Sequence, residues 1–194
     1  MSVDPNAPVI VAVAQQTWRE ADSARTPLDA LHTVASQALE DSGCEDLLAS
    51  IDAVATVRFL TDSNPDLIPL MPRNPGLLLA RRLGISRAQF FQTTLGGNTP
   101  QYLVNHFAGR IAGGEFNAVL ISGAELMNTF LSALRSGGDI SNWAGEATAG
   151  PILLGEERDG VNALERAHGL YEPVNTYPLF ENALQHHLGR SREE

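Results

Sequence analysis

The stretch "FFQTTLGGNTPQYLVN", residues Phe90 to Asn105, decides the fold class, because it joins a buried strand to a helix through a glycine turn. Its apolar, aromatic beginning is typical of a strand. Asn98 or Thr99 can cap the following helix, with Pro100 at the first position. The spacing places five apolar residues on the inward side of this helix: Leu103, Val104, Phe107, Ala108 and Ile111.

The same strand and helix pattern recurs on both sides of this stretch. We predict strands over residues 8–14, 51–60, 87–95 and 116–126, and helices over residues 26–43, 74–84 and 99–114. The first helix has Thr26 as cap, Asp29 to complete a capping box and Gly43 to end it. Three successive strand–helix–strand units predict an α/β fold with a largely parallel sheet and right-handed crossovers.

The pattern changes after residue 125. We expect a helix over residues 127–137, a polar glycine-rich loop, a short strand within residues 151–160 and a helix over residues 177–189. We therefore divide the chain into an amino-terminal α/β domain, residues 1–138, and the incomplete beginning of a loop region, residues 139–194. Unfinished structure after a four-strand sheet suggests half of a larger protein.

Composition narrows the partners that the chain can have. Its 194 residues carry a formal charge of −10, which argues against nucleic acid or an anionic membrane surface as a partner and favours small molecules or proteins. The apolar run at residues 8–14 is too short for membrane insertion, and no basic signal-peptide region precedes it. A single cysteine, Cys44, excludes an internal disulfide and a multi-cysteine metal site. The expected location is the cytoplasm.

The turn at Gly96, Gly97, Asn98 and Thr99 is the candidate binding site. Ligands of open α/β sheets collect at the carboxyl ends of strands, where helix N-termini present unpaired N–H groups to anions. Glycine allows a ligand to approach the backbone closely. The simpler alternative is that the two glycines only make a tight turn while Asn98 or Thr99 caps the helix.

Competing sites have less support. "LGGNTPQ" matches neither dinucleotide-binding nor P-loop spacing, and Ser122 lacks the glycine of a nucleophile elbow. His186 and His187 would point about 100° apart on a helix, so they do not form a chelating pair. Cys44 follows a helix end, away from the basic or helix N-terminal surroundings that activate thiols. The sequence therefore identifies no metal site.

The order of these segments resembles the amino-terminal domain of thiolases, in particular thiolase-like acetyl-CoA acetyltransferases akin to the sterol-carrier-protein-associated thiolases. The resemblance covers nearly the whole chain and is carried by "VIVAVAQQ", "IDAVATV", "GLLLARRLG", "GGNTPQ", "GGEFNAVLISGAELM" and "YPLFENALQHHLG". It implies a central, buried third helix preceded by a nucleophilic cysteine. Aligning "AGGEF" and "SGAELM" with the family's pattern places that nucleophile position at Gly97.

The resemblance implies acyl-CoA as substrate, no separate cofactor, a role in lipid metabolism and a homodimer or partner subunit. With Gly97 at the nucleophile position, an acyl-cysteine cannot form, so no catalytic residue is identifiable and the chain alone is expected to be inactive. Three functions remain open: part of an acyl-CoA acyltransferase, a CoA-ester aldolase or retro-aldolase subunit that uses backbone N–H groups, and a non-catalytic CoA-ester-binding or partner-binding module.

Overall fold

The computed structural model describes residues 7–191 and 193, which belong to two compact units, Met1–Gly155 and Glu156–Glu194. The first unit contains the sheet and the helices that cover it. The second contains two helices joined by a short turn. Each unit is described by itself.

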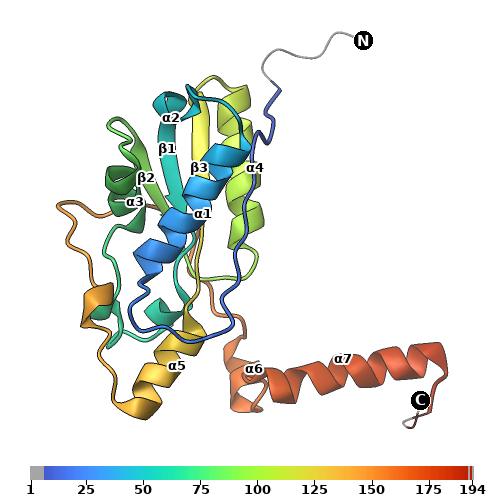
Figure 1. Cartoon of the computed structure of the whole chain (residues 1–194). Coiled ribbons are helices and arrows are strands. Elements are labelled where there is room, and N and C mark those ends of the chain that lie inside the picture. Colours follow the sequence, from blue (N-terminus) through green and yellow to red (C-terminus); the bar gives the residue numbers. More distant parts are fainter. Residues whose placement is uncertain (1–6, 192, 194) are drawn as a thin grey trace. The chain divides into compact units, whose positions relative to one another are not determined.

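The first unit is built on a four-stranded parallel sheet in the order β3-β1-β2-β4, shown in Figure 1. The strands are β1 (Ile51–Thr56), β2 (Gln89–Thr93), β3 (Ala118–Ser122) and β4 (Ile152–Leu154). Val54 of β1 is aligned with Phe90 of β2 and with Leu120 of β3. The α/β class and the parallel sheet are confirmed.

Helices cover both faces of this sheet. The longer helices are α1 (Pro27–Asp41), α3 (Pro75–Leu83), α4 (Thr99–Ala112) and α5 (Met127–Ser136); the shorter ones are α2 (Leu47–Ser50) and the 3₁₀ turns Leu60–Ser63, Ile68–Leu70 and Ser141–Trp143. On one face, Val54 packs in a core with residues of α1, α3 and α5. On the other, Ala53 and Ala55 pack in a core with residues of α4. The sheet is therefore the middle of three layers. Because all of its strands run parallel, their carboxyl ends lie at the same edge.

Local signals in the sequence predict the helix ends. The Thr26–Asp29 capping box forms in both directions at the start of α1. Asn74 accepts a hydrogen bond from the Leu77 N–H at the start of α3, and Gly84 ends that helix with φ of 78°. Capping depends on residues within one turn of each other, so sequence spacing was sufficient to predict it.

The strand predicted over residues 8–14 is wrong. These residues form no strand, and Val9, Ile10, Val11 and Val13 are 59–75% exposed. A strand needs a neighbour for its N–H and C=O groups, and no described strand pairs with this segment. The fourth strand of the sheet is β4, which pairs with β2 and lies within the segment where a short strand was expected.

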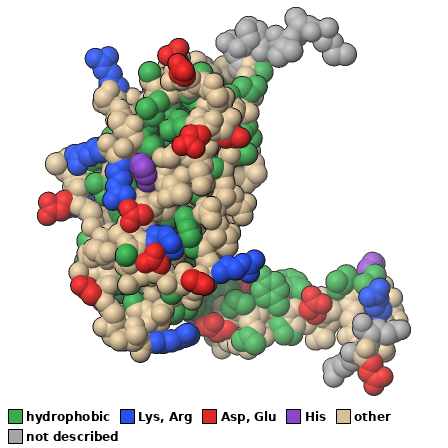
Figure 2. Space-filling view, viewed as in Figure 1, with side chains coloured by type: hydrophobic (Ala, Val, Ile, Leu, Met, Phe, Trp, Pro, Cys, Tyr) green, Lys and Arg blue, Asp and Glu red, His purple; other side chains and the backbone are tan. Residues whose placement is uncertain are grey.

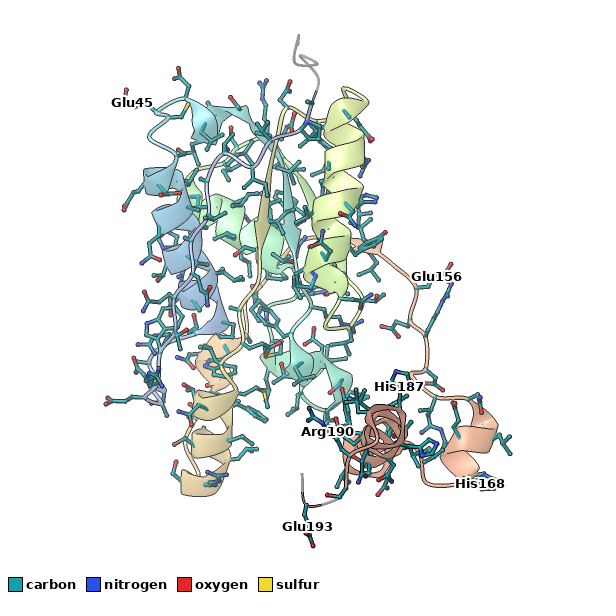
Figure 3. The ribbon with its side chains drawn as sticks, turned by 90° about the vertical axis from the view of Figure 1, so that its right-hand side faces the viewer. Glu45, Glu156, His168, His187, Arg190 and Glu193 are labelled. Carbon is teal, nitrogen blue, oxygen red and sulfur yellow. The ribbon has the colours of Figure 1, made fainter. Side chains whose placement is uncertain are left out.

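The second unit consists of α6 (Ala163–Ala167) and α7 (Pro173–Leu188). Its described residues have no buried side chains within either helix. Figure 3 looks along α7, whose side chains project around its circumference, and labels His187 and Arg190 near its end. Figure 2 shows hydrophobic side chains along the same helix. The helix predicted from residue 177 is present and begins four residues earlier, at Pro173.

Candidate functional site

The predicted glycine turn connects β2 to α4 at the carboxyl edge of the sheet. Asn98 occupies the cap position in helical backbone geometry, but its side chain accepts no hydrogen bond from the helix. Thr99 donates its hydroxyl to the Gly96 carbonyl at 2.7 Å, and its N–H donates to the same oxygen at 3.1 Å. The expected side-chain cap is therefore absent. The start of α4 is not closed by a side chain of the turn, and Gly96, Gly97 and Asn98 are exposed there.

Gly97 has neither backbone nor packing reasons to be glycine. Its φ is negative, and a Cβ added there would meet no heavy atom within 4 Å. By contrast, a Cβ on Gly96 would lie 2.8 Å from Asn98 Oδ1 and 3.3 Å from Thr99 Cγ2. A side chain at position 97 would thus fit without displacing anything, directly before the N-terminus of α4.

One side of α4 is buried and the other is exposed. Leu103 and Phe107 are fully buried against the sheet, where Phe107 contacts the Phe91 ring edge-to-face at 5.2 Å. Val104, expected to point inward, is 37% exposed together with Tyr102. The resemblance implied that this helix is buried at the centre of the domain. In the structure, only the side of α4 that carries Leu103 and Phe107 is buried. Within the first unit, α4 is the outermost layer on that face, and its outward residues are exposed.

A charged cluster lies at the ends of the neighbouring strands β1 and β3. The Arg58 N–H donates to Thr93 Oγ1 at 3.1 Å, and Arg58 Nε lies 3.4 Å from Asp62 Oδ2. Glu125, just beyond β3, accepts the Leu60 N–H at 2.7 Å. This cluster was missed from the sequence. The signal that could have found it is the charged pair in "VRFLTD", four residues apart directly after a buried strand.

Both carboxylates of the cluster have a raised pKa. Burial raises the pKa of Asp62, and the Arg58 guanidinium opposes that effect. The pKa of Glu125 is raised chiefly because surrounding atoms displace water, with repulsion from Asp62 acting in the same direction and the Leu60 N–H acting against it. Asp62 and Glu125 therefore hold protons more readily than ordinary surface carboxylates do. Carboxyl groups of this kind are better suited to general acid–base catalysis than to providing a fixed negative charge.

Polar side chains form a row on the sheet beside this cluster. Thr56 is aligned with Gln92 on one side and Ser122 on the other. Thr56 donates to the Phe91 carbonyl at 3.3 Å, whereas Gln92 Nε2 and Ser122 Oγ are buried without a hydrogen-bond partner among the described residues. Asp62 Oδ1 is likewise buried without a hydrogen-bond partner among the described residues. Such groups are commonly satisfied by internal water.

A cleft of about 270 Å³ opens next to Glu125. Its lining residues include Trp18, Arg25, Ala30 and Val34 of α1, and Glu125. The Arg25 guanidinium lies 4.7 Å from the centre of the Trp18 ring and 3.2 Å from Asp22 Oδ2. The turn residues Gly96 to Thr99 do not line this cleft, so the predicted site and the cleft are separate features.

The remaining sequence candidates belong to other elements than the turn. Cys44 is free and exposed between α1 and α2. Ser122 is buried at the end of β3, and His186 and His187 are on α7 in the second unit. Among the described residues no three His, Cys, Asp or Glu side chains are grouped to hold a metal ion. Within the same residues, every helix is too short or too polar to cross a membrane.

Comparison with known proteins relates this arrangement to one structural class. No family model matches the chain, and no curated protein matches it. Among solved structures, the chain is similar to a monomeric SCP2-thiolase-like protein type 1 from Mycobacterium smegmatis, with 36% identity and a TM-score of 0.50. The match covers 62% of this chain and 24% of that chain, so it spans about a quarter of the relative's length. The fold is thiolase-like.

Proposed function

We propose that this chain is the amino-terminal part of a thiolase-like acyl-CoA-processing protein of the acetyl-CoA acetyltransferase type, with Gly97 at the nucleophile position. The observation that carries the proposal is the uncapped start of α4, where Gly96, Gly97 and Asn98 are exposed directly after a buried strand. Likeness to an SCP2-thiolase-like structure at 36% identity supports the choice of acyl-CoA as ligand. The proposal includes a cytoplasmic location and a role in lipid metabolism.

In this proposal Gly96, Gly97, Asn98 and Thr99 bind the ester through the backbone. A helix N-terminus carries a partial positive charge and favours an oxyanion or enolate that forms next to it. Gly97 supplies no thiol, so an acyl group cannot be transferred to this position. The chain alone is therefore inactive in acyl transfer, and any further chemical groups come from residues or a partner beyond it.

Two alternatives differ in what the turn does after binding. A CoA-ester aldolase or retro-aldolase subunit would use the N–H groups of the turn to stabilise an enolate. A non-catalytic CoA-ester-binding or partner-binding module would use them for affinity alone. The open space at Gly97 is consistent with both, because a side chain would fit there and is nonetheless absent.

A cysteine introduced at position 97 tests the proposal directly. The background is Cys44→Ser, because Cys44 is exposed and would react as well. We expect the thiol of Gly97→Cys to titrate about one pKa unit below that of Gly109→Cys, since the two positions lie at opposite ends of the dipole of α4. Gly109 is the matched control because a Cβ there also meets no heavy atom within 4 Å. Thiol titration with an absorbance-reporting reagent measures the difference.

Incubation of both variants with acetyl-CoA separates thiolase-type acyl chemistry from the non-catalytic module. Acylation of the Gly97→Cys variant but not of the Gly109→Cys variant, detected by intact mass, supports thiolase-type acyl chemistry at this turn. A lowered thiol pKa and measurable CoA-ester binding without acylation favour the module. Equal thiol pKa values and no CoA-ester binding by calorimetry would contradict both.

A further inference from the structure

The segment Val9–Val13 is an unpaired strand former. It is apolar on both sides, and Val9, Ile10, Val11 and Val13 are 73, 75, 59 and 70% exposed. Among the described residues, one hydrogen bond holds its backbone to another element, from the Val13 N–H to Asp41 Oδ2 at the end of α1. A continuous run of mostly β-branched apolar residues with open backbone groups on both sides is the pattern of a strand that lacks neighbours.

The same unit contains an unpaired strand edge. Among the described strands, β3 pairs with β1 alone. The Ser122 carbonyl accepts the Val57 N–H and therefore faces β1. Because backbone groups alternate along a strand, the N–H and C=O of Val119 and Ile121 face the opposite side, where no described strand pairs with them. Figure 1 shows the N-terminal segment passing along this side of the unit.

We propose that two copies of this chain exchange these segments, so that Val9–Val13 of each copy adds as a strand to the β3 edge of the other. The chain carries both the donor and the acceptor, and each is five residues long, Val9–Val13 against Ala118–Ser122. Neither stretch contains a charged residue, so pairing meets no like-charge repulsion. The inference goes beyond the proposed function, because it needs no CoA ester.

A second copy fits the edge better than an unrelated partner does. A reciprocal exchange is closed and symmetric. It pairs the Val9–Val13 segment and the β3 edge of both copies at once. Each insertion contributes only five residues, whereas standard specific interfaces bury roughly 1,200–2,000 Å² in total. We therefore expect a reversible dimer rather than a permanent one.

Sedimentation velocity and hydrogen exchange on the whole chain test the exchange. Over a roughly hundredfold range of concentration, the mass should rise from one copy to two. Amide protection should rise with it in peptides covering residues 8–14 and 118–122. Val11→Lys places a charge in the middle of the added strand and should weaken dimerisation by roughly 10-fold or more. Val11 is exposed, so its replacement leaves the fold intact, as thermal unfolding would verify.

The matched control is Leu184→Lys on α7, which removes an apolar side chain of similar exposure, 51%, in the other unit. It should leave the dimer unchanged. The proposal is overturned if the chain stays monomeric at every concentration, or if the mass grows without limit beyond two copies. It is equally overturned if Leu184→Lys abolishes association while protection of residues 118–122 stays constant.

Discussion

The β2–α4 turn and the ends of β1 and β3 lie at the same edge of one sheet, yet different forces hold them in place. The turn has no charged side chain and depends on the packing of α4 below it, through Leu103 and Phe107. The ends of β1 and β3 are tied by the Arg58–Asp62 ion pair and by the Leu60 N–H bond to Glu125. A ligand at the turn would contact backbone N–H groups, whereas a ligand at the ends of β1 and β3 would contact the carboxyl groups of Asp62 and Glu125.

The largest effect is expected from removing the packing under the turn. Phe107→Ala should lower the free energy of unfolding by about 3–5 kcal/mol, because it empties a fully buried position between the Phe91 and Phe116 rings. Denaturant unfolding measures the loss. Tyr102→Ala on the exposed side of α4 is the control and should change stability little. Similar losses in both variants would show that α4 is not anchored by its inward stripe.

An intermediate effect is expected at the charged cluster, and its sign depends on pH. A carboxyl whose folded pKa is raised holds its proton more tightly in the folded protein, so its stabilising contribution is lost as pH rises from about 4 through the folded pKa. Glu125→Gln resembles the protonated form and can still accept the Leu60 N–H. It should be more stable than the parent at pH 7 by a few tenths to about 1 kcal/mol, because solvent screens part of the effect.

The difference between Glu125→Gln and the parent should shrink as the pH falls towards about 4, because the raised pKa of Glu125 favours its protonated form there. Unfolding curves at both pH values measure this. Glu125→Ala also removes the acceptor of the Leu60 N–H, so it should cost about 1 kcal/mol relative to Glu125→Gln. A gain from Glu125→Gln that persisted unchanged at pH 4 would argue against a titrating carboxylate as its cause.

The smallest effect is expected at the turn itself. Gly97→Ala should stabilise the chain by about 0.4–1 kcal/mol, because the position has negative φ and open space and alanine restricts the unfolded chain. Gly84→Ala is the contrasting variant, since φ of 78° at the end of α3 should make it destabilising by about 1 kcal/mol. Thermal unfolding compares them. Loss of stability in Gly97→Ala would show that this turn requires glycine for its own geometry.

Sequence reasoning succeeded where the determinants lie close together in the chain. The capping box at Thr26, the cap at Asn74 and the helix end at Gly84 each depend on neighbours within a turn, and all three are present. It failed for residues 8–14. Strand propensity is a local property, but a strand also needs a hydrogen-bonded neighbour, which must come from a distant part of the chain. It also passed over the hydrogen bond from the Leu60 N–H to Glu125, whose two residues lie 65 positions apart and meet only when β1 and β3 pair.

The α/β class, the parallel sheet and most helix ends follow from the sequence, because periodicity and capping are local properties of the chain. Three features depend on the folded arrangement: the sheet includes β4 instead of the first apolar segment, a charged cluster forms at the same sheet edge as the glycine turn, and Gly97 faces open space. These depend on which strands become neighbours, and that choice is made by packing among residues far apart in sequence.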